Sequence, residues 1–177
     1  MDNAGFDSGA RLLVLMRHGE AEPHSAGGDE DRELTEGGVE DARDVGAWLA
    51  SQGVELDLAI VSTAVRTRQT WEAMQEGGLE GEDVQYDEAI YNGTVDDLAE
   101  VVRTASDDVT HLLVIAHAPA VEDLATCAEV RCDLPDVWEP ATIGVMAHPG
   151  SWAQFPADDT VLLVCRPGGS EGLDADA

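Results

Sequence analysis

The chain has 177 residues, 44% of them hydrophobic, which is enough for one globular domain with a full-sized core. It carries 37 acidic residues and nine arginines but no lysine, and its net charge of −28 argues against nucleic acid or an anionic membrane as its main partner. No apolar run approaches membrane-spanning length, and the N-terminus lacks the basic and apolar regions of a signal peptide.

The cysteines and the charge both bear on the environment of the protein. Cys127, Cys132 and Cys165 are odd in number and show no metal-like pairing, which predicts free thiols in a reducing cytoplasm. Abundant acids without lysine are typical of proteins from salt-loving organisms, where a Debye length of about 3 Å at 1 M salt screens such charge. An acidic protein from a GC-rich mesophile is the alternative.

The first half of the chain predicts alternating strands and helices. Residues 1–10 read as a flexible tail, and the apolar run at 12–17 predicts a buried strand that is followed by a polar loop over 19–34. Thr35 can cap a helix over 36–51, which Gly53 would end. A second strand at 56–62 and a helix over 64–76 follow.

The second half continues the alternation. Residues 84–86 predict a short edge strand, and a capping box at Thr94 opens a helix to about Ala105. The most apolar run, 111–116, predicts a buried strand, and Pro119 starts a helix to about Val130. Residues 143–147 and 161–165 predict late strands, paired antiparallel at one side of the sheet.

This order predicts an α/β fold, a three-layer α/β/α sandwich with a mostly parallel central sheet. Residues 11–166 would form a single domain, and the Gly- and acid-rich residues 167–177 a disordered tail.

Three predicted strands end in side chains that suit phosphate chemistry. Arg17-His18-Gly19 lies at the end of the strand predicted at 12–17. Arg66 lies in the first turn of the helix after the strand at 56–62, and His117 follows the strand at 111–116. Ligands of open α/β sheets bind at the carboxyl edge of the strands. A histidine can attack phosphorus as a nucleophile, and arginine presents a fork of donors to phosphate oxygens.

The ordered set of motifs resembles the histidine phosphatase (phosphoglycerate mutase-like) superfamily, specifically its small SixA-like phosphohistidine phosphatase branch. The resemblance covers residues 11–166 and rests on five segments, at 15–21, 31–38, 61–70, 86–91 and 114–119. Two of these segments differ from the usual sequence motifs of the family. Ser62-Thr63 replaces Ser-Pro, and His117-Ala118-Pro119 replaces His-Asn-Pro. Neither departure removes a charged group.

The resemblance implies a role for each matching residue. His18 would form a covalent phosphohistidine, and Arg17, Arg66 and His117 would bind the phosphoryl oxygens. Arg32 matches an arginine near the pocket of the small branch. No metal or other cofactor is implied, and the partner is a phosphorylated substrate, either a phosphohistidine protein or a small phosphate ester. No motif indicates an oligomeric state.

The proton donor for the leaving group is a separate question. Glu88 is the first candidate, because larger family members place their acid at about this point of the chain, and Glu20 and Glu22 are alternatives. A phosphoramidate such as phosphohistidine protonates on its own leaving nitrogen, so a site without a committed acid would favour it over a sugar phosphate.

Other functions compete with this interpretation. The enzyme could be a small-molecule phosphomonoesterase, whereas mutases of the family are usually longer. A non-catalytic phosphate-binding module would not need both histidines. A metal site built from His18, Glu20 and His117 is a third alternative, although His-x-Glu is not a dedicated metal spacing.

Overall fold

The computed structural model describes residues 9–169, apart from the side chain of Glu82. Its sheet has seven strands in the order β3-β2-β4-β1-β6-β7-β5. The strands are β1 (Arg11–Arg17), β2 (Glu55–Ser62), β3 (Glu80–Asp87), β4 (His111–Ala116), β5 (Glu129–Val130), β6 (Ile143–His148) and β7 (Val161–Arg166). Strand β6 runs antiparallel to both of its neighbours, and every other pairing is parallel.

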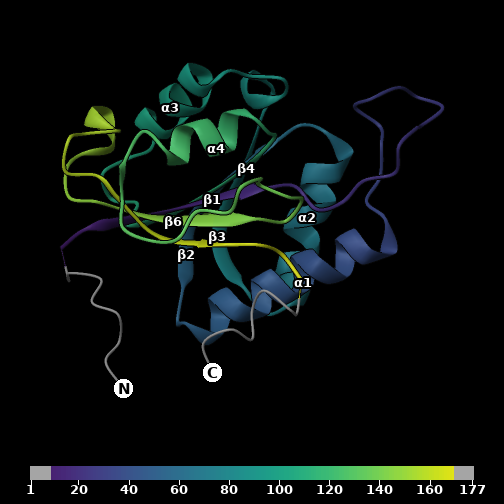
Figure 1. Ribbon diagram of the computed structural model, residues 1–177, viewed down its shortest axis with the longest axis horizontal. Helices are drawn as coiled ribbons and strands as arrows, with labels where there is room; N and C mark the ends of the chain where they lie inside the picture. Colours follow the sequence, from purple (N-terminus) through teal and green to yellow (C-terminus); the bar gives the residue numbers. More distant parts are fainter. Residues whose placement is uncertain (1–8, 170–177) are drawn as a thin grey trace.

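Helices cover both faces of this sheet (Figure 1). They are α1 (Glu36–Ser51), α2 (Val65–Glu76), α3 (Val95–Arg103) and α4 (Ala120–Ala125), with short 3₁₀ helices η1 (Glu88–Ile90) and η2 (Trp152–Gln154). Helices α3 and α4 lie on one face and α1 and α2 on the other (Figure 1). The predicted α/β/α sandwich with a mostly parallel sheet is confirmed.

The central strand β1 explains why the sheet is buried on both sides. Its side chains alternate between the faces. Leu13 and Leu15 pack with the α3–α4 layer, while Leu12, Val14 and Met16 pack with the α1–α2 layer. Because β1 is apolar at every position from Leu12 to Met16, it needs a helical layer on each side.

Most predicted elements have the predicted ends. Thr35 caps α1, its hydroxyl accepting from the Gly38 amide at 3.0 Å. The predicted capping box at the start of α3 is present, since the Asp97 carboxylate accepts from the Thr94 amide at 2.7 Å. Strands β6 and β7 pair antiparallel, as expected.

Two predictions about elements were wrong. The helix predicted to reach Val130 ends at Ala125, because the amide of Glu129 donates to Thr160 and β5 pairs with β7. The edge strand is longer than 84–86 and pairs along the whole of β2. Gly81 lies within it because a side chain there would meet the Trp71 ring at 2.8 Å.

Some expectations fall partly or wholly outside this description. The structure describes neither residues 1–8 nor 170–177, so the two predicted tails remain predictions, as does the domain boundary. Within the described part of the chain, no helix is both long and apolar enough to cross a membrane.

Candidate active site

The parallel pairing of β1, β2 and β4 brings three predicted residues to one sheet edge. Arg17 stands opposite Ala116 in the register, and the amide of His18 donates to the Ala116 carbonyl at 3.1 Å. His117 is the next residue after that carbonyl. The centroids of the His18 and His117 rings consequently lie 5.2 Å apart, although the residues are 99 positions apart in the chain.

His18 is held in one tautomer. Its Nδ1 lies 2.7 Å from the Gly19 carbonyl oxygen, which can only accept, so Nδ1 carries the proton and Nε2 does not. The side chain is buried, and burial lowers the pKa of His18 to about 4, with the positive charges of Arg66 and Arg17 acting in the same direction. At neutral pH the imidazole is therefore an uncharged nucleophile.

His117 is held from both sides. A guanidinium can only donate, so Nδ1 of His117 accepts from Arg66 Nη2 at 3.3 Å, and its Nε2–H donates to the Ser62 hydroxyl at 2.8 Å. Burial lowers the pKa of His117 to about 3, with the neighbouring His18 and Arg66 acting in the same direction. Ser62 is fully buried, so this arrangement lies inside the protein.

Arg17 and Arg66 both retain an unused donor. Arg17 donates from Nη1 to the Trp138 carbonyl, and Arg66 donates from Nη1 to the Asp29 carbonyl at 2.7 Å. The Nε atom of each is buried without a hydrogen-bond partner among the described residues. Burial lowers the pKa of Arg17. Two buried N–H donors without acceptors are costly, which marks both arginines as incompletely satisfied within the described residues.

Gly19 supports the close packing of the loop after β1. Its amide donates to the Thr70 hydroxyl at 3.0 Å. A side chain at Gly19 would lie 2.6 Å from the Gly38 carbonyl oxygen, and one at Gly38 would lie 2.1 Å from that of Glu20. The two glycines therefore let α1 begin directly against the loop that carries His18.

The loop before α1 contributes a residue that the sequence did not reveal, Asp29. Its carboxylate accepts from Arg66, from Arg32 Nε at 2.9 Å and from the Tyr91 hydroxyl at 2.8 Å. Arg32 thus reaches the site through Asp29, and its charge contributes to the lowered pKa of His18. One aspartate among 37 acids carries no distinguishing signal, which is why it was missed.

Among the described residues, the carboxylates of the three candidate proton donors make no hydrogen bond or ion pair with His18, His117, Arg17 or Arg66. Glu88 begins η1, is exposed, and its carboxylate makes no hydrogen bond or ion pair within residues 9–169. Glu20 accepts from the Thr35 hydroxyl at 2.9 Å, at the start of α1. Glu22 is exposed, and its main-chain carbonyl accepts from Arg32. The assignment of the proton donor stays a prediction.

The backbone amide at the start of α2 already has a hydrogen-bond partner. The amide of Val65, its first residue, donates to the Glu30 carbonyl at 2.9 Å, so the acidic loop covers this helix start. Across the described residues, no group of three or more His, Cys, Asp and Glu side chains could hold a metal ion.

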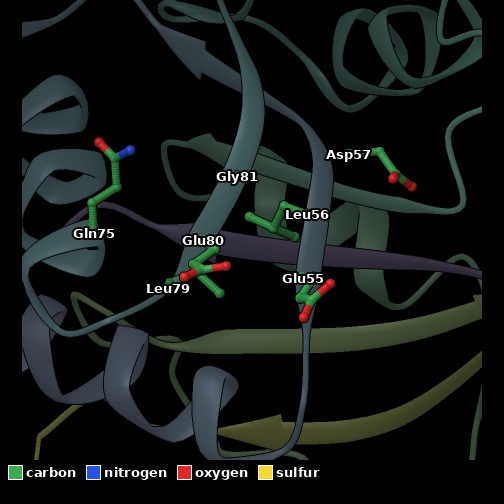
Figure 2. Close-up of a pocket in the computed structure, with 7 residues that line it drawn as sticks. All are labelled: Glu55, Leu56, Asp57, Gln75, Leu79, Glu80 and Gly81. Carbon is green, nitrogen blue, oxygen red and sulfur yellow. The ribbon is translucent and has the colours of Figure 1, made fainter.

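A cavity of about 510 Å³ lies away from these residues, at the amino ends of β2 and β3. Figure 2 shows Glu55 and Glu80 at the starts of these neighbouring strands, while Asp57 points away from the other labelled residues. The Asp57 carboxylate instead accepts from the amides of Thr110 and His111. The cavity is lined with carboxylates and contains no arginine, so it does not suit an anion.

Sequence comparison connects the chain to the histidine phosphatase superfamily. A family model of the histidine phosphatase superfamily (branch 1) matches residues 13–113. An uncharacterized protein of Mycobacterium tuberculosis H37Rv is 30% identical over 156 residues, covering 84% of this chain and 96% of that protein. A 2,3-bisphosphoglycerate-dependent phosphoglycerate mutase of Methylorubrum extorquens is 46% identical over 77 residues, covering 40% of this chain and 36% of the mutase.

Solved structures with the same fold cover almost the whole chain. A protein of Nakamurella multipartitia, provisionally described as the phosphohistidine phosphatase SixA, aligns with a TM-score of 0.76 and 32% identity over 92% of this chain and 99% of its own. A protein histidine phosphatase SixA complexed with tungstate aligns with a TM-score of 0.71 and 23% identity, covering 87% and 95%.

Proposed function

Because the chain belongs to the histidine phosphatase superfamily (branch 1), we propose that it is a hydrolase that removes a phosphoryl group through a covalent phosphohistidine on His18. One observation carries this proposal. The Nδ1–H of His18 donates to Gly19, which leaves Nε2 unprotonated in a site with the buried Arg66 and the half-buried Arg17.

The chemistry follows from this orientation. Nε2 of His18 attacks phosphorus, the bond to the leaving group breaks, and the electron pair stays with the leaving atom. Arg17 and Arg66 bind the phosphoryl oxygens and stabilise the charge that spreads over them during transfer. Both ring nitrogens of His117 are hydrogen-bonded here, so a third contact requires its Nε2–H to turn from Ser62 to a phosphoryl oxygen. Water then attacks the phosphoenzyme, releases phosphate, and returns His18 to its neutral form.

For the substrate, we propose a phosphohistidine of a protein in the cytoplasm. The 32% identity to the SixA-described protein, across nearly the full length of both chains, supports this choice. The exposed Glu88, without a contact to the site, also supports it, because phosphohistidine needs little help from an acid. A small-molecule phosphomonoesterase with Glu88 as its acid is the second candidate.

Trapping the phosphoenzyme tests the mechanism. The protein is incubated with ³²P-labelled phosphohistidine peptide or acetyl phosphate and quenched in base, which preserves phosphohistidine. We expect acid-labile label on the wild type and none on His18→Asn. Product formation without label would contradict the covalent mechanism, and absence of both product and label would favour a phosphate-binding module. Loss of turnover in EDTA would favour a metal enzyme.

Comparing substrates tests the proposed specificity. We expect a higher kcat/KM for the phosphohistidine peptide than for a sugar phosphate, and the same values for Glu88→Gln. A strong preference for the sugar phosphate, lost in Glu88→Gln, would instead support the phosphomonoesterase.

A further inference from the structure

Asp29 places a negative charge among the positive groups of the site. Its Oδ2 accepts from the Tyr91 hydroxyl at 2.8 Å and from Arg66 Nη2 at 3.1 Å, and its Oδ1 accepts from Arg32 Nε at 2.9 Å. Its main-chain carbonyl also accepts from Arg66. Three parts of the chain, the acidic loop, α2 and the segment after η1, therefore meet at this aspartate.

Asp29 lies on the solvent side of Arg66. Both Arg66 and Tyr91 contact His117, Arg66 through Nη2 at 3.3 Å and Tyr91 through its ring, whose centroid lies 5.7 Å from that of the imidazole. One hydrogen bond thus separates Asp29 from residues that touch His117. The Asp29 side chain is 53% exposed, whereas that of Arg66 is 4% exposed, so the carboxylate lies between the buried arginine and the solvent.

Asp29 is a poor candidate for a proton donor. The hydrogen bond from Tyr91 lowers the pKa of Asp29, and the charges of Arg66 and Arg32 lower it further. The carboxylate is therefore ionised at neutral pH. A fixed anion beside a phosphate site opposes the binding of phosphate, but it holds Arg66 in place and its charge can attract a positively charged leaving group.

We propose that Asp29 determines leaving-group specificity, favouring phosphoramidates protonated on nitrogen over phosphate esters that leave as neutral or anionic oxygen. This inference rests on the proposed function and deepens it. A carboxylate offers about four lone-pair positions, and three of those on Asp29 are used in the contacts above. The remaining position is on Oδ1 of this half-exposed side chain and can accept an N–H from the substrate.

The chemical step balances without an additional acid. An N-phosphorylated imidazole carries a proton on its other ring nitrogen, and that N–H⁺ donates to Asp29. The bond from His18 Nε2 to phosphorus forms while the P–N bond breaks, and its electron pair returns to the leaving nitrogen. The leaving imidazole is then neutral and keeps its single N–H. Attraction to Asp29 increases the fraction of bound substrate that is protonated, which is the form that leaves readily.

Asp29→Asn tests this inference, because it removes the charge at nearly constant shape. The probes are phosphoramidate, whose nitrogen leaves as ammonia, and p-nitrophenyl phosphate, whose oxygen leaves as an anion. We expect kcat/KM to fall about fivefold for phosphoramidate and to rise for p-nitrophenyl phosphate, a magnitude typical of a partly exposed charge pair. Asp29→Glu, which keeps the charge, should retain the wild-type ratio of the two values.

Asp31→Asn is the matched control, because it removes one charge from the same exposed loop. It should leave the ratio unchanged. An equal fall for both probes in Asp29→Asn would show that Asp29 only positions Arg66, and an unchanged ratio would also overturn the inference. His18 labelling is followed on the same preparations. If the wild-type protein acquires no label, the proposed function is overturned. If label forms on His18 but Asp29→Asn leaves the ratio of the two kcat/KM values unchanged, only the role of Asp29 is overturned.

Discussion

The imidazole rings of His18 and His117 lie 5.2 Å apart, and each has a lowered pKa, about 4 and about 3. We therefore expect neither ring to titrate near the ordinary histidine value of 6.5. Histidine ring signals in NMR, assigned with His18→Asn and His117→Asn, would measure both values directly. A midpoint near 6.5 for either ring would contradict the expected effect of burial.

The same two pKa values predict how stability depends on pH. Between pH 6.5 and about 4 for His18, and between pH 6.5 and about 3 for His117, the unfolded chain binds protons that the folded chain does not. Their contribution to stability is therefore complete above pH 6.5 and is lost as the pH falls through these windows. The free energy of unfolding of His18→Asn should vary less with pH than that of the wild type. An unchanged slope would contradict this linkage.

Arg66 donates at the same time to the Asp29 carbonyl, the Asp29 carboxylate and His117, which only a guanidinium fork can do. Arg66→Lys should therefore lower kcat/KM by about 10²-fold, comparable to the loss of one transition-state donor. Arg68→Lys is the control, because Arg68 lies on the outer side of the same helix over the Tyr86 ring. Similar losses in both variants would indicate a general effect on α2.

Arg66 donates to Nδ1 of His117 and so fixes its tautomer, and the Ser62 hydroxyl accepts from the Nε2–H that results. Ser62→Ala should lower kcat about tenfold, the cost of one buried hydrogen bond, while leaving KM nearly unchanged. Ser62→Thr should keep most of the activity, since it keeps the hydroxyl. If Ser62→Ala changes only the free energy of unfolding and not kcat, the hydroxyl has a structural role alone.

Gly19 and Gly38 let α1 pack directly against the loop after β1. Gly19→Ala and Gly38→Ala should each destabilise the fold by about 1–3 kcal/mol through overpacking. Gly37→Ala is the control, because its nearest neighbour would lie 3.8 Å away, and alanine should be neutral or stabilising in this helix. Urea unfolding would measure all three variants, and equal effects would contradict the packing argument.

The net charge of −28 predicts that salt stabilises the fold by screening repulsion. The midpoint of urea unfolding should rise as KCl is increased towards 1 M. Highest stability at low salt would contradict the interpretation of the acidic surface as an adaptation to salt.

Local patterns were enough to predict most elements of the fold. Helix α1 has the predicted ends because its cap, its apolar stripe and its stop signal all lie in one continuous segment, from Thr35 to Gly53. The predicted helix after Pro119 was too long because residues 129–130 pair with β7, about 30 residues further along the chain. Such pairing depends on a distant partner that no local pattern specifies.

In the candidate site, too, some features could be predicted from local sequence and others depend on tertiary contacts. His18, Arg66 and His117 could be predicted to converge, because each follows a buried strand and parallel strands bring their carboxyl ends to one edge. Contacts with Gly19, Ser62 and Arg66 decide which ring nitrogen of each histidine carries the proton, and these contacts form only on folding. The extent to which burial lowers each pKa likewise depends on the folded structure. Asp29 is the clearest case. Among 37 acids it is distinguished only by the side chains of Arg66, Arg32 and Tyr91 that surround it, and those come together through tertiary packing.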